Sequence, residues 1–281
     1  MGAIRFSSNQ DIDRHFAKGI GTGRGAEYRP GFLVREFSAS SRSSILHCEL
    51  NGRELQLLSP LDRDYCLLAL YFDKLSDLRE NMPTHPSRTL AIAKALGLSH
   101  PMQSNGVPKI LMTSVVLTKK DSAGRPLDVA RSLLPVPARK WNERQLRERL
   151  TTLEILRVHW KMQGMPWSIV SAEQINRTLV QNVDFAFEAT KVEEIVRDTE
   201  GYAAFMPVAS TLNWTCASVE LCVRAIARST RRSFEETMNF FKLGLWKRHI
   251  LFDMTQARIH TTNPLSAQPQ FDTQWQERRA A

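Results

Sequence analysis

The sequence predicts an α/β protein with an N-terminal domain built on a mixed sheet and a mostly helical C-terminal domain. Three observations support this fold class. A capped helix precedes two strands that a hairpin turn joins, and a long helix with a last strand follows, all between residues 59 and 178. Beyond that point the sequence becomes more helical and more acidic. Because 281 residues are enough for two hydrophobic cores, we expect domains at 1–178 and 179–281.

The first segment combines a short helix, expected over residues 9–18, with the glycine-rich run GIGTGRG at 19–25. These glycines neither follow a strand nor open a helix, so the context of a dinucleotide-binding or phosphate-binding loop is missing. Arg24 in this run is a candidate contact for a DNA backbone or a partner surface. A plain mobile tail is the alternative.

Strands and a capped helix are expected next. The strand segments are FLVREF at 32–37, SILHCEL at 44–50 and RELQLL at 53–58. Asn51-Gly52 between the last two favours a type I′ hairpin. The helix should begin at Pro60 and run to about residue 72, with Ser59 as its N-cap and Asp62 at the third helical position. That capping role would by itself account for the acidity of Asp62.

A second helix is expected over residues 87–96, followed by strands at 110–118 and 126–134 that complete the mixed sheet. The sequence KKDSAGRP between these strands has the composition of a hairpin turn, which favours a solvated role for Asp121. Alternation along the second strand places Asp128 on the same face as Ser132 and Leu134.

A long basic helix over residues 142–163 and a strand in PWSIVSAEQI complete the domain. The helix carries basic side chains that are candidates for a phosphate-binding face, namely Arg144, Arg147, Arg149, Arg157 and Lys161. The alternative is an ordinary solvated helix face.

The C-terminal domain has the outline of a winged helix. NWTCASVELCVRAIARS predicts one amphipathic helix, and a capping box from Ser233 to Glu236 opens a second. Strand-like WKRHILFDM follows, with RIHTT at 258–262 beyond it. The basic residues Arg231, Arg232, Lys247 and Arg248 are candidates either for DNA contact or for a charged rim that meets a protein partner.

Composition favours an intracellular protein with a polyanionic partner. The formal charge is +9 and the isoelectric point is near 9.6, and neutralising phosphates releases condensed counterions. No apolar stretch reaches the roughly 20 residues of a membrane span, and the N-terminus lacks an apolar signal core, so a cytoplasmic location is expected. The four cysteines lack the spacing of a zinc site or a disulfide framework.

An ordered set of segments resembles the TnsA family, the endonuclease subunit of heteromeric transposases. The segments are GIGTGRGAEYRPGFLVREFSASSRS, NGRELQLLSPLD, LRENMPTHPSRTLAIAKALGLSHP and LRVHWKMQGMPWSIVSAEQIN. The resemblance implies a restriction-endonuclease-like fold for the N-terminal domain. It also implies transposon-end DNA, a TnsB-like transposase and a TnsC-like AAA+ ATPase as partners.

The same resemblance implies a metal site whose positions are degenerate here. The family places an acid on the capped helix, an aspartate on the first strand and a Gln-x-Lys on the second, and these fall on Asp62, Val115, Ser132 and Leu134. A further acid falls on Leu156. Divalent cations need several convergent oxygen ligands, so we expect no intact catalytic site, no bound cofactor and no strand cleavage.

Two alternatives stay open. The chain could be an active Mg²⁺-dependent endonuclease that cuts one strand at transposon ends through shifted ligands around Asp62, Asp64 and Asp128. It could instead be a DNA-binding regulator outside transposition, for which the charge and the winged-helix outline suffice.

Overall fold

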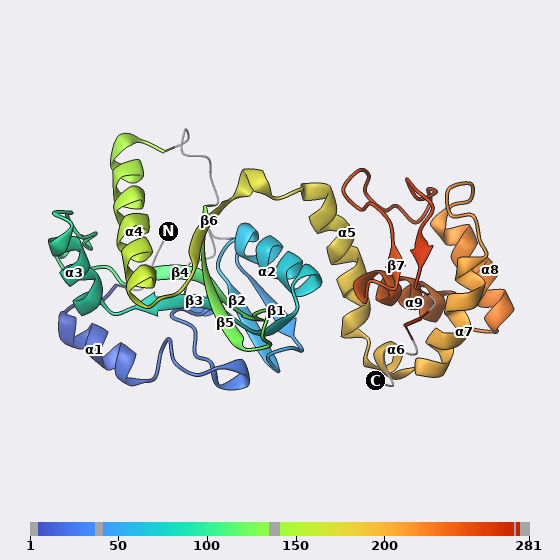
Figure 1. Ribbon diagram of the computed structural model, residues 1–281, viewed down its shortest axis with the longest axis horizontal. Helices are drawn as coiled ribbons and strands as arrows, with labels where there is room; N and C mark the ends of the chain where they lie inside the picture. The colour runs from blue at the N-terminus through green and yellow to red at the C-terminus, as the bar shows by residue number, and fades with distance from the viewer. Residues whose placement is uncertain (1–4, 37–41, 135–140, 273, 276–281) are drawn as a thin grey trace. The chain divides into compact units, whose positions relative to one another are not determined.

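The chain forms two compact units in the computed structural model, which describes residues 5–36, 42–134, 141–272 and 274–275. The first unit is Met1–Ile175 and the second is Asn176–Ala281 (Figure 1). The division falls three residues before the boundary expected from the sequence. Each unit has its own buried core, and each is described separately below.

The first unit contains a four-stranded mixed sheet. Its strands are β3 (Leu75–Thr84), β4 (Leu111–Lys120), β5 (Pro126–Leu134) and β6 (Trp167–Ser171), in the order β3-β4-β5-β6. The first two pairings are antiparallel, and β5 pairs with β6 in parallel. A parallel pair needs a crossover, which helix α4 (Glu143–Met162) lies within. The predicted mixed sheet is confirmed.

Strand β3 was not predicted from the sequence. Asp77, Arg79, Glu80 and Asn81 in this strand are all buried, so hydrophobic alternation does not mark it. Arg79 pairs with Asp77 at 3.1 Å, and Glu80 pairs with Arg53 at 2.7 Å. Buried charges that are paired in this way occur inside a sheet, but only the tertiary structure supplies their partners.

A separate two-stranded hairpin, β1 (Ser44–Cys48) and β2 (Arg53–Leu57), precedes the sheet. Cys48 pairs with Arg53, so the loop has four residues and the predicted two-residue type I′ turn is wrong. Only Gly52 in this loop has positive φ, at +62°. The Asn51 side chain instead donates to the Asp77 carboxylate at 3.1 Å and to the Leu78 carbonyl oxygen, which holds the loop on β3.

The predicted strand at 32–37 is also wrong. Val34–Glu36 form the short 3-10 helix η2, and Phe37 lies outside the described residues. The Glu36 carboxylate accepts a hydrogen bond from the Leu33 N–H, and the Gln56 side chain accepts one from the Val34 N–H. These side chains satisfy backbone groups that a strand neighbour would otherwise satisfy.

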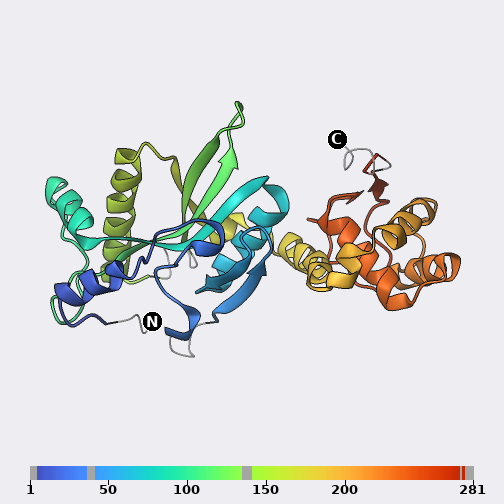
Figure 2. The same ribbon diagram turned by 90° about the horizontal axis from the view of Figure 1, so that it is seen from below.

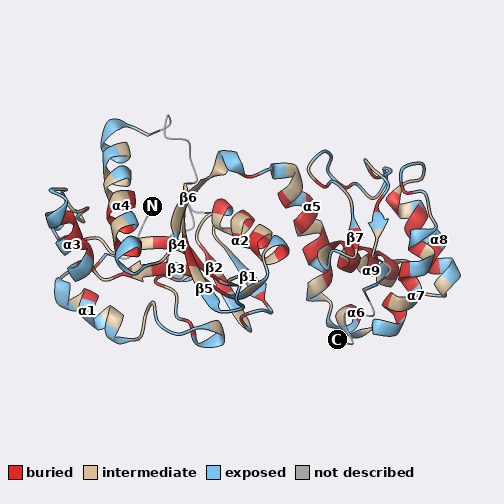
Figure 3. Cartoon of the chain, viewed as in Figure 1, coloured by how far each residue is buried: buried red, intermediate tan, exposed pale blue. Residues whose placement is uncertain are grey.

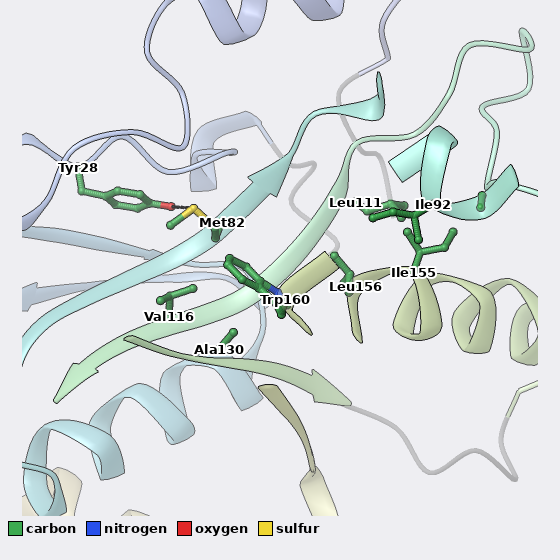
Figure 4. Close-up of a cluster of buried hydrophobic side chains, with 10 residues drawn as sticks. Tyr28, Met82, Ile92, Leu111, Val116, Ala130, Ile155, Leu156 and Trp160 are labelled. Carbon is green, nitrogen blue, oxygen red and sulfur yellow. Dashed lines mark hydrogen bonds between the residues drawn. The ribbon is translucent and has the colours of Figure 1, made fainter. Parts of the chain in front are cut away.

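Four helices surround the sheet of the first unit: α1 (Asn9–Ala17), α2 (Pro60–Phe72), α3 (Pro86–Ala95) and α4. Figures 1 and 2 show α2 and α4 on opposite faces of the sheet. Side chains of β3, β4, α3 and α4 meet in one buried cluster that includes Val116, Leu156 and Trp160 (Figure 4). The Trp160 Nε1–H donates to the Thr113 hydroxyl at 2.8 Å, which satisfies the buried indole.

The second unit is mostly helical. Its helices are α5 (Arg177–Phe187), α6 (Glu193–Arg197), α7 (Thr199–Ser210), α8 (Val219–Thr230) and α9 (Phe234–Trp246). Figure 3 shows buried residues along the sides of α9 that face the other helices. Fully buried Trp214 stacks on Phe241 with ring centroids 4.7 Å apart, and its Nε1–H donates to the Ala209 carbonyl.

The predicted amphipathic helix begins later than expected, because Ser218 caps it and residues 213–218 lie outside it. Strand β7 (Ile250–Leu251) pairs with β8 (Gln270–Phe271), so RIHTT at 258–262 is not its partner. Buried Asn182 holds the intervening loop: its amide donates to the carbonyls of Met254 and Ala257 and accepts from the Ile259 N–H. The winged helix stays a prediction.

Among the described residues, no helix combines the length and the apolar character that crossing a membrane requires. The longest helix, α4, carries charged side chains along its whole length.

Candidate functional site: the fork between strands β4 and β5

The candidate site lies where β4 and β5 separate. Their pairing runs from Lys120 and Pro126 to Val115 and Arg131, while the other edge of β5 pairs with β6 from Ala130 to Leu134. Ser114 lies at this fork, and its hydroxyl accepts a hydrogen bond from the Leu133 N–H at 2.9 Å. Of the predicted positions, Val115, Ser132 and Leu134 all lie beside the fork.

Asp62 reaches the site from the first turn of α2. Ser59 caps the helix, and its hydroxyl donates to the Asp62 carboxylate at 2.7 Å while accepting from the Asp62 N–H at 3.2 Å. Burial raises the pKa of the Asp62 carboxyl, whereas the Ser59 hydrogen bonds and the Arg149 charge act in the opposite direction. The capping role predicted for Asp62 is therefore present, in a desolvated position.

Arg149 approaches the same carboxylate from α4. Its guanidinium donates to the Leu133 carbonyl at 3.1 Å, and its Nε is buried without a hydrogen-bond partner among the described residues. Burial lowers the pKa of Arg149, and the Asp62 carboxylate raises it again. The Asp62 carboxylate and the Arg149 guanidinium thus lie within electrostatic reach of each other at the fork.

The remaining positions carry no free oxygen ligand. Val115 is completely buried in the central strand β4, between Glu80 and Arg131 in the register. The Ser132 hydroxyl is 3.1 Å from the Trp167 Nε1–H, which donates to it. Leu134 is half-buried and apolar, and Leu156 packs in the core cluster. These side chains cannot offer the carboxylate and ammonium groups of a metal-dependent nuclease.

The residues at the fork do not fit a divalent cation. Mg²⁺ is held by several oxygen atoms whose charge offsets its own, whereas here the Glu80 carboxylate opposite Val115 is already bound by Arg53, which leaves that of Asp62. The Arg149 guanidinium lies within electrostatic reach of that carboxylate and would oppose a bound cation. Over the part of the chain that the structure describes, no three His, Cys, Asp or Glu side chains form a metal-binding group.

Asp128, the candidate for a shifted ligand, is bound in a different cluster on the sheet. Its carboxylate lies 2.8 Å from both Arg24 and Arg79, and it accepts a hydrogen bond from the Thr118 hydroxyl at 2.6 Å. The hydrogen bonds lower the pKa of Asp128 although burial raises it. The carboxylate is thus directed at two guanidinium groups. Asp64 is two positions beyond Asp62 on α2, so the helix directs it to a different side.

The glycine-rich run is packed against the sheet. A Cβ on Gly21 would lie 2.7 Å from the Pro83 ring, and one on Gly31 would lie 2.7 Å from the Asn81 carbonyl oxygen. The Gly31 N–H donates to that same Asn81 carbonyl. Arg24 is 56% exposed, and its guanidinium binds Asp128. The glycines therefore permit close approach of the segment to β3. Neither of the two predictions for this segment, an arm over DNA or a partner and a mobile tail, included this packing.

The basic residues of α4 do not share one face. Arg147 is exposed and pairs with Glu143, while Arg144 and Lys161 are exposed. Arg149 lies five positions beyond Arg144, roughly 140° around the helix, and turns to the fork. The structure thus brings Arg149 to the candidate catalytic site and leaves the other cations for the surface.

The basic residues of the second unit lie at opposite ends of α9. Arg231 and Arg232 precede its first turn, whereas Lys247 and Arg248 follow its last. Thirteen helical residues separate them by about 20 Å. Arg232 forms ion pairs with Asp198 at 2.6 Å and Glu236 at 3.2 Å, while the other three are exposed.

Sequence reasoning missed Ser114 and the inward direction of Arg149. Ser114 carried no signal, because a serine in a strand has no distinguishing pattern. Arg149 did carry one: it precedes the buried residues Leu153, Leu156 and Trp160 by four, seven and eleven positions, which is the spacing of one helix face.

The transposon Tn7 transposition protein TnsA of Escherichia coli is 30% identical to the chain over 205 residues. The match covers 73% of this chain and 71% of that protein. No protein-family model matches the sequence.

Proposed function

Because the chain belongs to the TnsA family, we propose that it is a transposition protein whose endonuclease site has lost strand cleavage. It would bind transposon-end DNA and dock with a TnsB-like transposase and a TnsC-like ATPase. The family resemblance supports the partners, and the formal charge of +9 supports the polyanionic ligand.

The observation that carries the loss of cleavage is the donor set at the fork. Asp62 lies within reach of the Arg149 guanidinium, and the Glu80 carboxylate opposite Val115 is bound by Arg53. The family resemblance places the strand aspartate and the lysine at Val115 and Leu134, which are apolar. Hydrolysis of a phosphodiester at such a site would lack both the metal that activates water and the cation that offsets phosphate charge. Apolar side chains there also remove the desolvation cost of the former charges.

Two sets of exposed basic residues support the rest of the proposal. Arg144 and Lys161 are exposed on α4, and Arg231, Lys247 and Arg248 are exposed in the second unit. Arginine and lysine at such positions bind phosphates without reading sequence. We infer that these residues position DNA, whereas Arg24, Arg149 and Arg232 serve mainly ion pairs or hydrogen bonds within the protein.

The test maps both strand ends at the donor in a reconstituted reaction with the cognate transposase and Mg²⁺ or Mn²⁺. We expect breaks only on the strand that the transposase cuts, with the second strand still joined, so that cointegrates form. Breaks on the second strand that depend on this chain would refute the proposal. If Asp62→Ala and Asp128→Ala then removed those breaks, the active endonuclease with shifted ligands would replace it.

A DNA-binding regulator outside transposition gives a different result. Its binding to DNA would be salt-dependent and unchanged by the transposase, and deletion of the chain would leave donor cleavage as it was. We expect instead that the chain is needed for assembly of the transposase on the transposon ends.

A further inference from the structure

A groove between α3 and α4 lies on the first unit, apart from the fork. Its volume is about 510 Å³. Helix α3 and the residue after it contribute Arg88, Ala91, Ala95 and Leu96, and α4 contributes Val158, His159 and Met162. The floor is Ile92, which packs with Ile155 in the core cluster (Figure 4). The groove is thus an open continuation of the core packing.

Large apolar side chains in this groove are exposed to solvent. Met162 is 71% exposed and Leu96 is 38% exposed, and Ala91 and Ala95 beside them are also exposed. Single exposed apolar residues are ordinary, but a concave cluster of them that touches the core marks an interaction site. The volume lies in the range of about 300–1,000 Å³ that is typical of binding pockets.

The residues that line the groove include one charged side chain, Arg88, and no carboxylate. Helix α3, with the sequence PSRTLAIAKA, carries Arg88 and Lys94 and no acidic residue. The Glu154 carboxylate, one turn before Val158 on α4, is paired with Arg157 at 2.6 Å. An occupant that places carboxylates next to an apolar surface therefore complements this groove in both shape and charge.

His159 adds a polar group to the apolar wall. It is buried, and its imidazole makes no hydrogen bond to any residue that the structure describes, although its ring meets the Trp160 ring edge to face. Burial, with a smaller contribution from Arg88, lowers the pKa of His159. His159 lines the groove, so a partner group that enters it meets this imidazole.

We propose that the groove binds an amphipathic helix of a partner protein, with apolar residues on one face and carboxylates beside them. The apolar residues lie between α3 and α4, and the carboxylates lie near Arg88. Such recognition uses anchors at i, i+3 and i+7 of the bound helix. DNA is a poorer fit, because a phosphate backbone leaves Leu96, Val158 and Met162 without apolar contact. This inference does not depend on whether the chain cleaves DNA.

The probe is a fluorescein-labelled model helix of about 16 residues with leucines at i, i+3, i+4 and i+7 and glutamates on both flanks. A matched peptide replaces each glutamate by lysine. Fluorescence anisotropy with the full chain should show that the acidic peptide binds about tenfold tighter or more, and salt should reduce this preference. Hydrogen exchange should show protection of α3 and the last turns of α4.

Variants locate the binding. Met162→Glu places a charge in the groove and should weaken the acidic peptide by about tenfold or more. Leu150→Glu is the matched control, because Leu150 is 56% exposed on the same helix but does not line the groove. Arg88→Glu should reduce or reverse the preference for the acidic peptide. Since Met162 and Arg88 are exposed, all three variants should fold.

Four results would overturn the proposal. The two peptides could bind equally, or Met162→Glu could leave the acidic peptide's affinity unchanged. A concentration-dependent dimer of the full chain that Met162→Glu dissociates would assign the groove to a second copy. Loss of duplex DNA binding in Met162→Glu, with Leu150→Glu unaffected, would assign it to DNA.

Discussion

Replacing Arg149 tests whether a guanidinium has taken the electrostatic place of a metal at the fork. Arg149→Met keeps the aliphatic stem and removes the charge. The substitution removes the charged hydrogen bond to the Leu133 carbonyl, which contributes about 1.5–3 kcal/mol. It also removes a counter-charge to half-buried Asp62, which contributes about 1 kcal/mol or less. Removing the buried Nε, which lacks a hydrogen-bond partner among the described residues, stabilises the folded chain by about 1 kcal/mol. The net loss in unfolding free energy is about 2 kcal/mol.

The pH dependence separates the two contributions. The pKa of Asp62 is raised in the folded chain, so its contribution to stability is present below the ordinary aspartate pKa and is lost as pH rises through the raised value. Asp62→Asn should therefore gain stability relative to the wild type between acid and neutral pH. In the Arg149→Met background the pKa of Asp62 rises further, so the loss extends to higher pH.

The assay is a double-mutant cycle of Arg149→Met and Asp62→Asn, measured by hydrogen exchange of the β4 and β5 amides. We expect a coupling of about 1 kcal/mol at neutral pH that disappears when Asp62 is protonated. Arg147→Met is the control, because Arg147 is 77% exposed and pairs only at the surface, and it should change stability by less than about 0.5 kcal/mol. Absence of coupling at neutral pH would refute the assignment of Arg149 as the counter-charge.

Two further predictions concern the backbone. Asn182→Leu removes three hydrogen bonds to Met254, Ala257 and Ile259, and should lower stability by about 3 kcal/mol, read as faster hydrogen exchange in that loop. Unchanged exchange there would show that the loop is held by other contacts. Gly21→Ala meets the Pro83 ring and should lower the melting temperature more than Gly25→Ala, because both glycines have positive φ but only Gly21 lacks space. Equal effects would contradict the close approach.

Local sequence determined the elements whose signals are local. Ser59, Pro60 and Asp62 place the start of α2, since capping needs only neighbouring backbone groups. The capping boxes at Asn142 and Ser233 are present as well. Strands β4 and β5 lie close to their expected bounds, because apolar runs on both sides of a turn are a short-range signal.

Only the tertiary structure decided the rest. Strand β3 escaped prediction because its buried charges are stabilised by Arg53 and Asp128, which are distant in sequence. The hairpin loop has four residues because Asn51 bonds to β3 and not because of an intrinsic turn preference. In the sequence Arg149 resembles the other basic residues of its helix. In the structure it lies near Asp62 and donates to the Leu133 carbonyl, which places it at the fork. Helical spacing sets the direction of a side chain, but tertiary packing sets which groups it contacts. The electrostatics of this site depend on those contacts.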